Sequence, residues 1–370
     1  MCVAVFNRSH YLFKMQYFNV IRYSTAATTV KPFKSIPGLS SLPLIGPLHH
    51  FIPGIGSIGF QQNFYELSKK LYEKFGPIVK LDGLFARASM VILYEPEHFD
   101  QVYRAEDVLP SRPGFEILTY YRTTLRKSTY EGIYGLTTAT SLKVITEAKR
   151  HIIERGHDIP EEDKSVVEKL LAIDEKVAVT MANEMMLAGI DTVAFTTISL
   201  LYKLATNQQC QDKLREEIRS PEQSNRYLRA CLKESLRLAA VISANLRRTT
   251  KEHVVAGYQI PKGVDVIAPN ELLSRMDKHY PRAEEFLPER WLVGKTDPLY
   301  YGNCHPMVTL PFGFGIRSCI GRRIAELQIE VFVKTLIRDV KVTWEGPPAQ
   351  VVATVMNTFK KPFHFKFYPL

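Results

Sequence analysis

The sequence feature that most constrains the fold is an unbroken helical pattern from residue 174 to about residue 206, DEKVAVTMANEMMLAGIDTVAFTTISLLYKLAT. No proline interrupts it, and a rise of 1.5 Å per residue makes such a helix on the order of 45 to 50 Å long. A helix of this length can cross a whole domain. If it spanned a bilayer instead, Asp191 would lie at mid-membrane, at a cost of roughly 2.5 to 3.5 kcal/mol. We therefore expect a buried core helix.

The flanking sequence predicts a mainly α fold with a small β portion. Apolar spacing indicates a helix over residues 60–75, and GPIVKLDG and ASMVILYEP are typical of two short strands that precede a helix from about Glu97. Further along, SPEQSNRYLRACLKESLRL is expected to form a helix with Ser220 as N-cap that runs to about Leu238.

Residues 31–54 are rich in proline and glycine and predict an extended, turn-rich lead-in. The following GIGSIG fits a dinucleotide fingerprint, but prolines rather than a strand precede it, and the fingerprint requires strand, turn and helix. The glycines are therefore interpreted as part of the lead-in.

Composition and charge narrow the class of protein further. The 370 residues are 45% hydrophobic and 23% charged, as in ordinary globular proteins, and five unevenly spaced cysteines indicate neither a disulfide framework nor paired zinc knuckles. Half of the net charge of +10 comes from the stretch before Glu66, which contains no acidic residue, so no nucleic-acid partner is expected. Residues 1–33 predict a mitochondrial presequence and lead-in, with a frayed basic terminus as the alternative.

One cysteine requires an explanation of its own. In PFGFGIRSCIGRRIAEL the helical pattern resumes just after Cys319, so the thiolate would be stabilised by unpaired N–H groups and the helix macrodipole. That position suits a metal ligand or a nucleophile, and no base is adjacent. Phe312, Gly315 and Gly321 favour close approach of something flat and bulky, and Arg317 can pair with carboxylates. An inert cysteine in a tight turn is the alternative.

The stretch FGFGIRSCIG resembles the ligand loop of the cytochrome P-450 superfamily of haem-thiolate monooxygenases. The resemblance implies a haem b cofactor with Cys319 as axial thiolate, Phe312 as its shield and Arg317 as a propionate partner, while Gly321 lets the next helix pass under the ring. It also implies a reaction in which one oxygen atom of O2 enters a small apolar substrate, xenobiotic or steroid-like, and the other is reduced to water. A zinc or redox-thiol protein ranks behind this interpretation.

Three further stretches match the family in the family's order. Glu234 and Arg237 in KESLR, with Arg290 in FLPERW, resemble its structural salt-bridge triad. AGIDT resembles the oxygen-activating stretch of the long distal helix, in which Thr192 would hydrogen-bond the oxygen and Asp191 would relay protons. The alternatives are a surface helix pair for the first match and simple helix filler for the second.

A third stretch offers a second propionate partner. Arg247 matches this position of the family by its distance to GYQIPKG, and Arg248 is its close competitor.

The stretch GRRIAEL after the cysteine resembles the mitochondrial branch, which receives electrons from a small acidic ferredoxin of the adrenodoxin type. Arg322 and Arg323 would face that partner, and Arg229 and Lys233, four residues apart, would add a second basic pair. The alternative is a solvated helical face. LPSRPGFEILTYYR and RMDKHYPRAEEFLPERWL look most like insect mitochondrial members linked to oxidation of foreign compounds. The expected location is the matrix side of the inner membrane, with peripheral membrane contact.

The resemblance breaks between Ala139 and Thr146, where the family would place its helices C to H. The only tryptophans are Trp291 and Trp344, so the family's W-x-x-x-R pair has no match. The expected organisation is residues 1–33 as presequence and lead-in, 34–139 as a mixed α and β part, and 140–370 as a helical haem-binding part. The alternative function is a non-catalytic shortened product that binds haem poorly.

Overall fold

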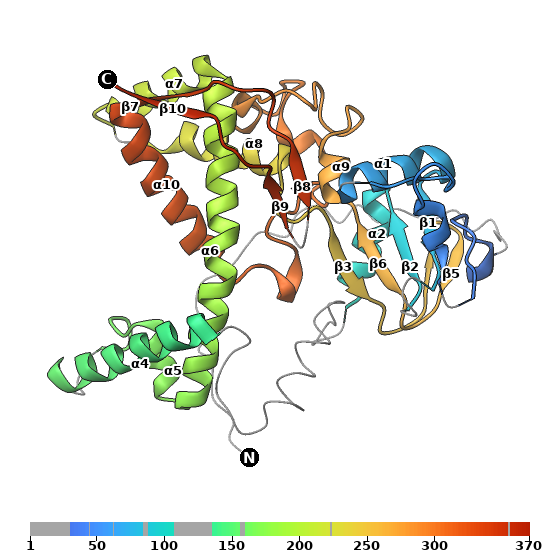
Figure 1. Cartoon of the computed structure of the whole chain (residues 1–370), viewed down its shortest axis with the longest axis horizontal. Coiled ribbons are helices and arrows are strands. Elements are labelled where there is room, and N and C mark those ends of the chain that lie inside the picture. Colours follow the sequence, from blue (N-terminus) through green and yellow to red (C-terminus); the bar gives the residue numbers. More distant parts are fainter. Residues whose placement is uncertain are drawn as a thin grey trace.

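The long helix expected around residues 174–206 is present as α6 (Glu175–Thr206), and the Asp174 carboxylate caps its start by accepting the N–H of Lys176. The computed structural model describes residues 30–43, 45–61, 63–83, 88–106, 135–155, 160–222, 224–353 and 356–370. Figure 1 shows α6 running through the height of the molecule, with helical segments across one end and a helical layer beside the other. The mainly α fold with a small β portion is confirmed.

The remaining helices surround α6 or cover the sheet. They are α1 (Phe64–Phe75), α2 (Pro96–Arg104), α4 (Gly135–Arg155), α5 (Val166–Leu171), α7 (Gln208–Arg219), α8 (Arg226–Leu238), α9 (Asn270–Ser274) and α10 (Arg322–Asp339). Short 3-10 turns lie between them: η1 (Phe33–Ser35), η2 (Pro47–Phe51), η5 (Pro288–Trp291), η6 (Tyr301–Asn303) and η7 (Gly315–Arg317).

A four-stranded sheet forms the second part of the molecule, at the right of Figure 1. Its order is β1-β2-β6-β3; β2 and β6 run parallel and the outer pairs antiparallel. The strands of this sheet are β1 (Ile78–Leu81), β2 (Met90–Leu93), β3 (Asn245–Arg248) and β6 (Asp265–Ala268). Three two-stranded sheets pair β4 (His253–Val255) with β5 (Tyr258–Ile260), β7 (Val340–Trp344) with β10 (Phe365–Pro369), and β8 (Val351–Ala353) with β9 (Asn357–Phe359).

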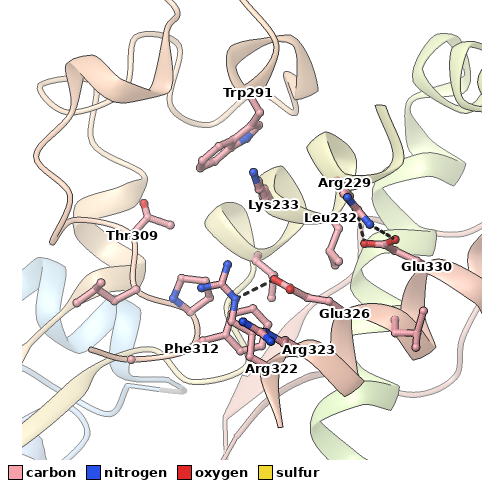
Figure 2. A pocket seen from close by; sticks show the side chains of 15 residues that line it. Arg229, Leu232, Lys233, Trp291, Thr309, Phe312, Arg322, Arg323, Glu326 and Glu330 are labelled. Atoms are coloured by element: carbon pink, nitrogen blue, oxygen red, sulfur yellow. Dashed lines mark hydrogen bonds and ion pairs between the residues drawn. The ribbon is translucent and has the colours of Figure 1, made fainter. Parts of the chain in front are cut away.

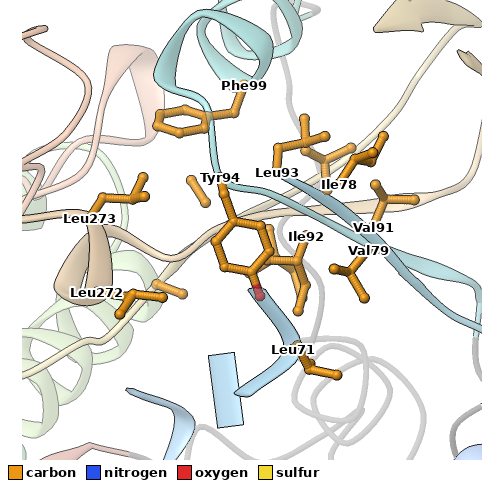
Figure 3. Packing of buried hydrophobic residues seen from close by; sticks show 14 of the residues in the cluster. Leu71, Ile78, Val79, Val91, Ile92, Leu93, Tyr94, Phe99, Leu272 and Leu273 are labelled. Atoms are coloured by element: carbon orange, nitrogen blue, oxygen red, sulfur yellow. The ribbon is translucent and has the colours of Figure 1, made fainter. Parts of the chain in front are cut away.

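Two larger hydrophobic cores correspond to these two parts, and a small third one joins α4 and α5 to the start of α6. The first lies around the four-stranded sheet, where Ile78, Val91 and Leu93 pack with Phe99 of α2 and Leu272 of α9 (Figure 3). The second lies around the C-terminal part of α6 and joins it to α7, α8, α10 and β7. The Cys319 loop reaches this second core, because Phe312 packs against it.

The expectation that α6 is a buried core helix holds for its C-terminal part and, near its start, for Ala178 and Val179, which pack against Ile145 of α4. Leu200, Leu201 and Leu204 are buried in the second core, whereas Leu187 and Ile190 are exposed. By length and composition alone α6 could cross a membrane, and 22% of its most apolar window is buried. The helix is therefore exposed around its middle, in the stretch that contains Asp191.

The expected start of the helix after Ser220 is wrong. Ser220 is the C-cap of α7, and α8 begins six residues later at Arg226. The N–H groups of Tyr227 and Leu228 donate to the Glu217 carboxylate at 2.8 and 3.0 Å, so an acid on the preceding helix caps α8. The negative charge of this carboxylate is also stabilised by the positive end of the helix macrodipole.

The chain forms one continuous helix, α4, at the place where the family's helices C to H would be inserted. α4 passes through residues 139 and 146 without interruption and packs with α5 against α6. At the other end of the chain, the expected presequence lies largely outside the described residues. The lead-in is held to the sheets by bridges from Lys31 to Tyr258 and from Gly38 to Lys80.

Candidate functional site

The loop that carries Cys319 is a tight turn between η7 and α10. Gly321 is the N-cap of α10, so the cysteine lies two residues before the helix cap. The Cys319 N–H donates to the Phe312 carbonyl at 2.8 Å and closes the loop. Gly315 has φ +64, in the left-handed region that favours glycine, whereas Gly321 has an ordinary φ of −85. The Cys319 side chain is exposed.

Two large apolar residues close to Cys319 in the sequence are exposed. Ile320 is 87% exposed, and Ile316 is exposed as well. Arg317 is also exposed at the end of η7. Phe312 is half-buried, with the Arg322 guanidinium 5.1 Å from its ring centroid.

The two candidate arginines of β3 have different partners. Arg247 is 1% exposed, donates from Nη2 to the Phe314 carbonyl at 3.0 Å and contacts the Glu106 carboxylate. Arg248 instead donates to both carboxylate oxygens of Asp265 at 2.7 and 2.9 Å. Of the two, therefore, Arg247 is the one that reaches the Cys319 loop.

The stretch predicted to activate oxygen lies at the middle of α6, where the helix is partly exposed. The Thr192 hydroxyl donates to the Ala188 carbonyl at 2.6 Å, one turn back, and Asp191 is exposed. A Cβ added to Gly189 would meet no atom within 4 Å. Val193, which follows Thr192, packs against the same core as Phe312 of the cysteine loop. The helix and the loop thus share one supporting core.

Glu234, Arg237 and Arg290 meet in a buried cluster in which all three side chains are 0% exposed. Arg237 donates to both oxygens of the Glu234 carboxylate, at 2.9 and 2.8 Å, and Arg290 donates to one of them at 2.9 Å. The Trp291 indole N–H donates to the same carboxylate at 2.9 Å, and the Leu287 N–H at 3.1 Å. Sequence reasoning missed Trp291, although it directly follows Arg290.

All four residues proposed to meet a ferredoxin line one cavity of ≈ 630 Å³ (Figure 2). Arg229 pairs with Glu330 at 2.9 Å, and Arg322 pairs with Glu326 at 3.0 Å. The Lys233 ammonium lies 5.7 Å from the Trp291 ring centroid, and Arg323 is exposed. Four cations and two carboxylates give this cavity a net positive lining.

A row of exposed apolar side chains along α10 was not anticipated. Ile324, Leu327 and Val331 lie on successive turns at spacings of three and four residues, with Phe332 beside them, and all are exposed. The sequence pattern predicted a helix here, but it does not tell an exposed apolar face from a buried one. Within the described residues, no group of three or more His, Cys, Asp or Glu side chains could hold a metal ion.

The comparisons with known proteins agree with this arrangement. The family model described as Cytochrome P450 matches residues 151–363, more than half of the chain. The chain therefore belongs to the cytochrome P450 family, and the predicted resemblance is confirmed.

Similar curated proteins come from flies. Cytochrome P450 CYP12A2 of Musca domestica is 38% identical over 274 residues, which cover 68% of this chain and 51% of that protein. The probable mitochondrial cytochrome P450 12b2 of Drosophila melanogaster is 36% identical over 282 residues, covering 71% and 51%. In both alignments the chain spans about half the length of its relative.

A third alignment bears on the missing segment. The probable mitochondrial cytochrome P450 12a5 of Drosophila melanogaster is 27% identical over 497 positions, covering 91% of each protein. That alignment is longer than the 370 residues of the chain, so it bridges residues that the relative has and this chain lacks. The predicted internal shortening is confirmed.

Proteins of this family hold haem b through an axial cysteine thiolate, and the residues around Cys319 fit such a group. A thiol at the surface of a glycine-containing turn, flanked by exposed Ile316 and Ile320, offers an axial ligand in an apolar face. The exposed Arg317 and the buried Arg247 supply cationic donors of the kind that carboxylates bind. The donor set therefore matches an apolar ring that carries carboxylates.

Proposed function

We propose that this chain is a haem-dependent monooxygenase whose iron ligand is Cys319. The observation that carries the proposal is the Cys319 turn itself, with its exposed thiol, a left-handed glycine and Arg247 reaching the Phe314 carbonyl. When bound, haem would supply the redox chemistry with O2 that amino-acid side chains lack. The substrate is a small apolar molecule, xenobiotic or steroid-like.

The residues of the chain have separable tasks in this proposal. The Cys319 thiolate binds the cofactor, and Arg317 and Arg247 orient it through charge-assisted hydrogen bonds to its carboxylates. On α6, the Asp191 carboxylate takes up protons from solvent, which its exposure allows. The Thr192 hydroxyl, now donating to the Ala188 carbonyl, can pass a proton once it turns from that bond.

The electron donor in this proposal is an acidic ferredoxin that docks on the cavity lined by Arg229, Lys233, Arg322 and Arg323. Lys233 and Arg323 are the stronger candidates, because the other two cations are already paired with Glu330 and Glu326. A net positive surface steers an acidic partner and accelerates its encounter, and salt screens that effect within roughly 8 to 10 Å. Phe312 lines the same cavity, so a docked partner would lie close to the Cys319 loop.

Charge reversal tests the docking surface. We expect Lys233→Glu and Arg323→Glu to slow the reduction of the haem-loaded protein by a ferredoxin, in stopped-flow measurements, about tenfold at low salt and less at high salt. Lys366→Glu, an exposed lysine on β10, is the matched control and should leave the rate unchanged. If Lys233→Glu and Arg323→Glu were reduced as fast as the parent and the Lys366→Glu control, the docking surface would be removed from the proposal.

A mitochondrial location, on the matrix side of the inner membrane with peripheral membrane contact, completes the proposal. It is supported by the word mitochondrial in the names of relatives such as cytochrome P450 12b2 and by the acid-free basic opening of the sequence. Fractionation of cells followed by N-terminal sequencing of the organelle protein tests it. Recovery with microsomes, or a first residue of Met1, would contradict it.

A second candidate is that the shortened chain turns over poorly. The observation that favours it is the exposed apolar row on α10 together with exposed Leu187 and Ile190 at the middle of α6. Apolar surface left in water forgoes roughly 25 cal/mol of stabilisation per Å². The haem-to-protein ratio and product formation with ferredoxin and its reductase distinguish the two candidates. Near-stoichiometric haem with sustained turnover supports the monooxygenase, and low haem without product supports the second candidate.

A further inference from the structure

A buried carboxylate outside the Cys319 loop joins two segments that are distant in sequence. Glu271 on α9 is 3% exposed, and its Oε2 accepts a hydrogen bond from the Asn357 side chain at 2.8 Å. Ser243 also hydrogen-bonds to this carboxylate, and the Glu271 N–H donates to the Ser243 carbonyl at 3.0 Å. Glu271 therefore contacts both β9, through Asn357, and the connection between α8 and β3, through Ser243.

Asn357 makes the same link from the other side. Its side-chain N–H2 group lies 2.9 Å from the Ala240 carbonyl and 2.8 Å from the Ser243 hydroxyl, and its backbone N–H donates to the Val241 carbonyl at 2.8 Å. The side chain is buried, so each of these bonds replaces a bond to water. Leaving such a group without its partner costs roughly 1 to 3 kcal/mol.

The two segments lead to the two sides of the proposed haem site. Asn245, at the end of the α8–β3 connection, donates to the Leu310 carbonyl at 3.2 Å, and Arg247 follows with its bond to Phe314. On the other side, Phe359 of β9 packs against Tyr202 of α6, with ring centroids 5.1 Å apart. One segment is thus tied to the Cys319 loop and the other to α6.

The ion pair of Glu271 with Arg275 is a long one. The Arg275 guanidinium lies 4.0 Å from Oε1 and is paired more closely with Glu284, at 2.7 Å. Burial raises the pKa of Glu271, and the hydrogen bonds from Ser243 and Asn357 oppose that rise. The carboxylate is therefore held mainly by neutral donors that belong to the two segments it joins.

We infer that Glu271 is a positioning residue, which with Asn357 fixes residues 239–244 and β9 relative to each other and so shapes the space between α6 and the Cys319 loop. This inference rests on the proposed function for the statement that substrate enters this space. Ile242, exposed in the first segment, directly precedes Ser243, so this link should also restrict its position.

Hydrogen exchange of the protein without substrate tests the link itself. In Glu271→Ala we expect the amide of Asn357 and those of residues 239–244 to exchange about tenfold faster, the equivalent of one lost hydrogen bond. Amides of β1 and β2 should be unchanged. Glu271→Gln keeps an acceptor oxygen and should restore the parent's protection, and Asn357→Ala, measured in parallel, should reproduce the loss.

The matched control is Glu168→Gln, which alters another glutamate of low exposure, 6%, whose partners are Arg155 on α4 and the N–H of Ser165. It should leave residues 239–244 unchanged. Unaltered exchange of these residues in both Glu271→Ala and Asn357→Ala, or an equal increase in β1 and β2, would overturn the inference.

A second measurement connects the link to the site. In haem-loaded Glu271→Ala, the Kd of a bulky azole inhibitor, titrated through the haem absorption band, should rise about tenfold, while the Kd of imidazole itself changes less than about twofold. Equal changes for the two probes would overturn the role in positioning. Failure of the parent to take up haem would count against the proposed function alone, because the exchange measurement does not require haem.

Discussion

Removing the carboxylate of Glu234 should destabilise the whole fold. This carboxylate accepts five hydrogen bonds, from Arg237 Nε and Nη2, Arg290 Nε, Trp291 Nε1 and the Leu287 N–H. Glu234→Ala would leave two fully buried guanidiniums without their counter-charge. Breaking a buried pair in this way costs about 3 to 5 kcal/mol, a large part of the 5 to 15 kcal/mol by which a domain is typically stable.

Urea unfolding followed by circular dichroism measures the effect. With a loss of about 4 kcal/mol and a slope of about 2 kcal/mol per M, the midpoint should fall by roughly 2 M. The control is Glu285→Gln, which breaks an exposed pair with Arg282 but keeps the backbone carbonyl that accepts from Arg237 Nη2. Its midpoint should be unchanged, because exposed pairs contribute little. A Glu234→Ala midpoint within about 0.3 M of the parent would refute the reasoning.

Two further predictions concern single cations. Burial lowers the pKa of Lys203 from 10.5 to about 8, so below pH 8 the native state carries a charge that burial disfavours. Lys203→Met should then raise the free energy of unfolding by about 3 kcal/mol at pH 7, and the gain should shrink as pH rises from 8 to 10.5; a gain independent of pH would contradict this origin. On β3, Arg247→Ala should weaken haem binding by the apoprotein at least about tenfold in a haemin titration, whereas Arg248→Ala should weaken it less than about threefold. Equal losses would contradict the assignment of Arg247 to the Cys319 loop.

The sequence predicted the elements that depend on local pattern. The α6 helix and the strands β1 and β2 follow from apolar periodicity, and the order of the loop, triad and helix stretches identified the family. The same reasoning placed the start of α8 at Ser220, where serine and proline imitate an N-terminus. It failed there because Glu217 caps the helix from a neighbouring helix, which is a tertiary contact.

The site was predictable where a motif carries it and not where packing decides it. Neighbouring arginines such as Arg247 and Arg248 cannot be told apart from spacing alone, whereas the strand alternation of β3 sends one to the Cys319 loop and the other to Asp265. The cluster of Glu271 and Asn357 joins residues 86 positions apart and follows no motif. The exposed row on α10 likewise depends on which helices surround it, and the sequence pattern alone describes it equally well as a buried face.

The absorption spectrum of the reduced, carbon-monoxide-treated protein tests the central claim most directly, because it reports haem and thiolate together. Cys304→Ala is the matched control, since burial raises the pKa of the Cys304 thiol to about 11 and keeps it protonated. We predict that the parent and Cys304→Ala show the band of a thiolate-ligated haem and that Cys319→Ala lacks it. Retention of that band in Cys319→Ala would contradict the account.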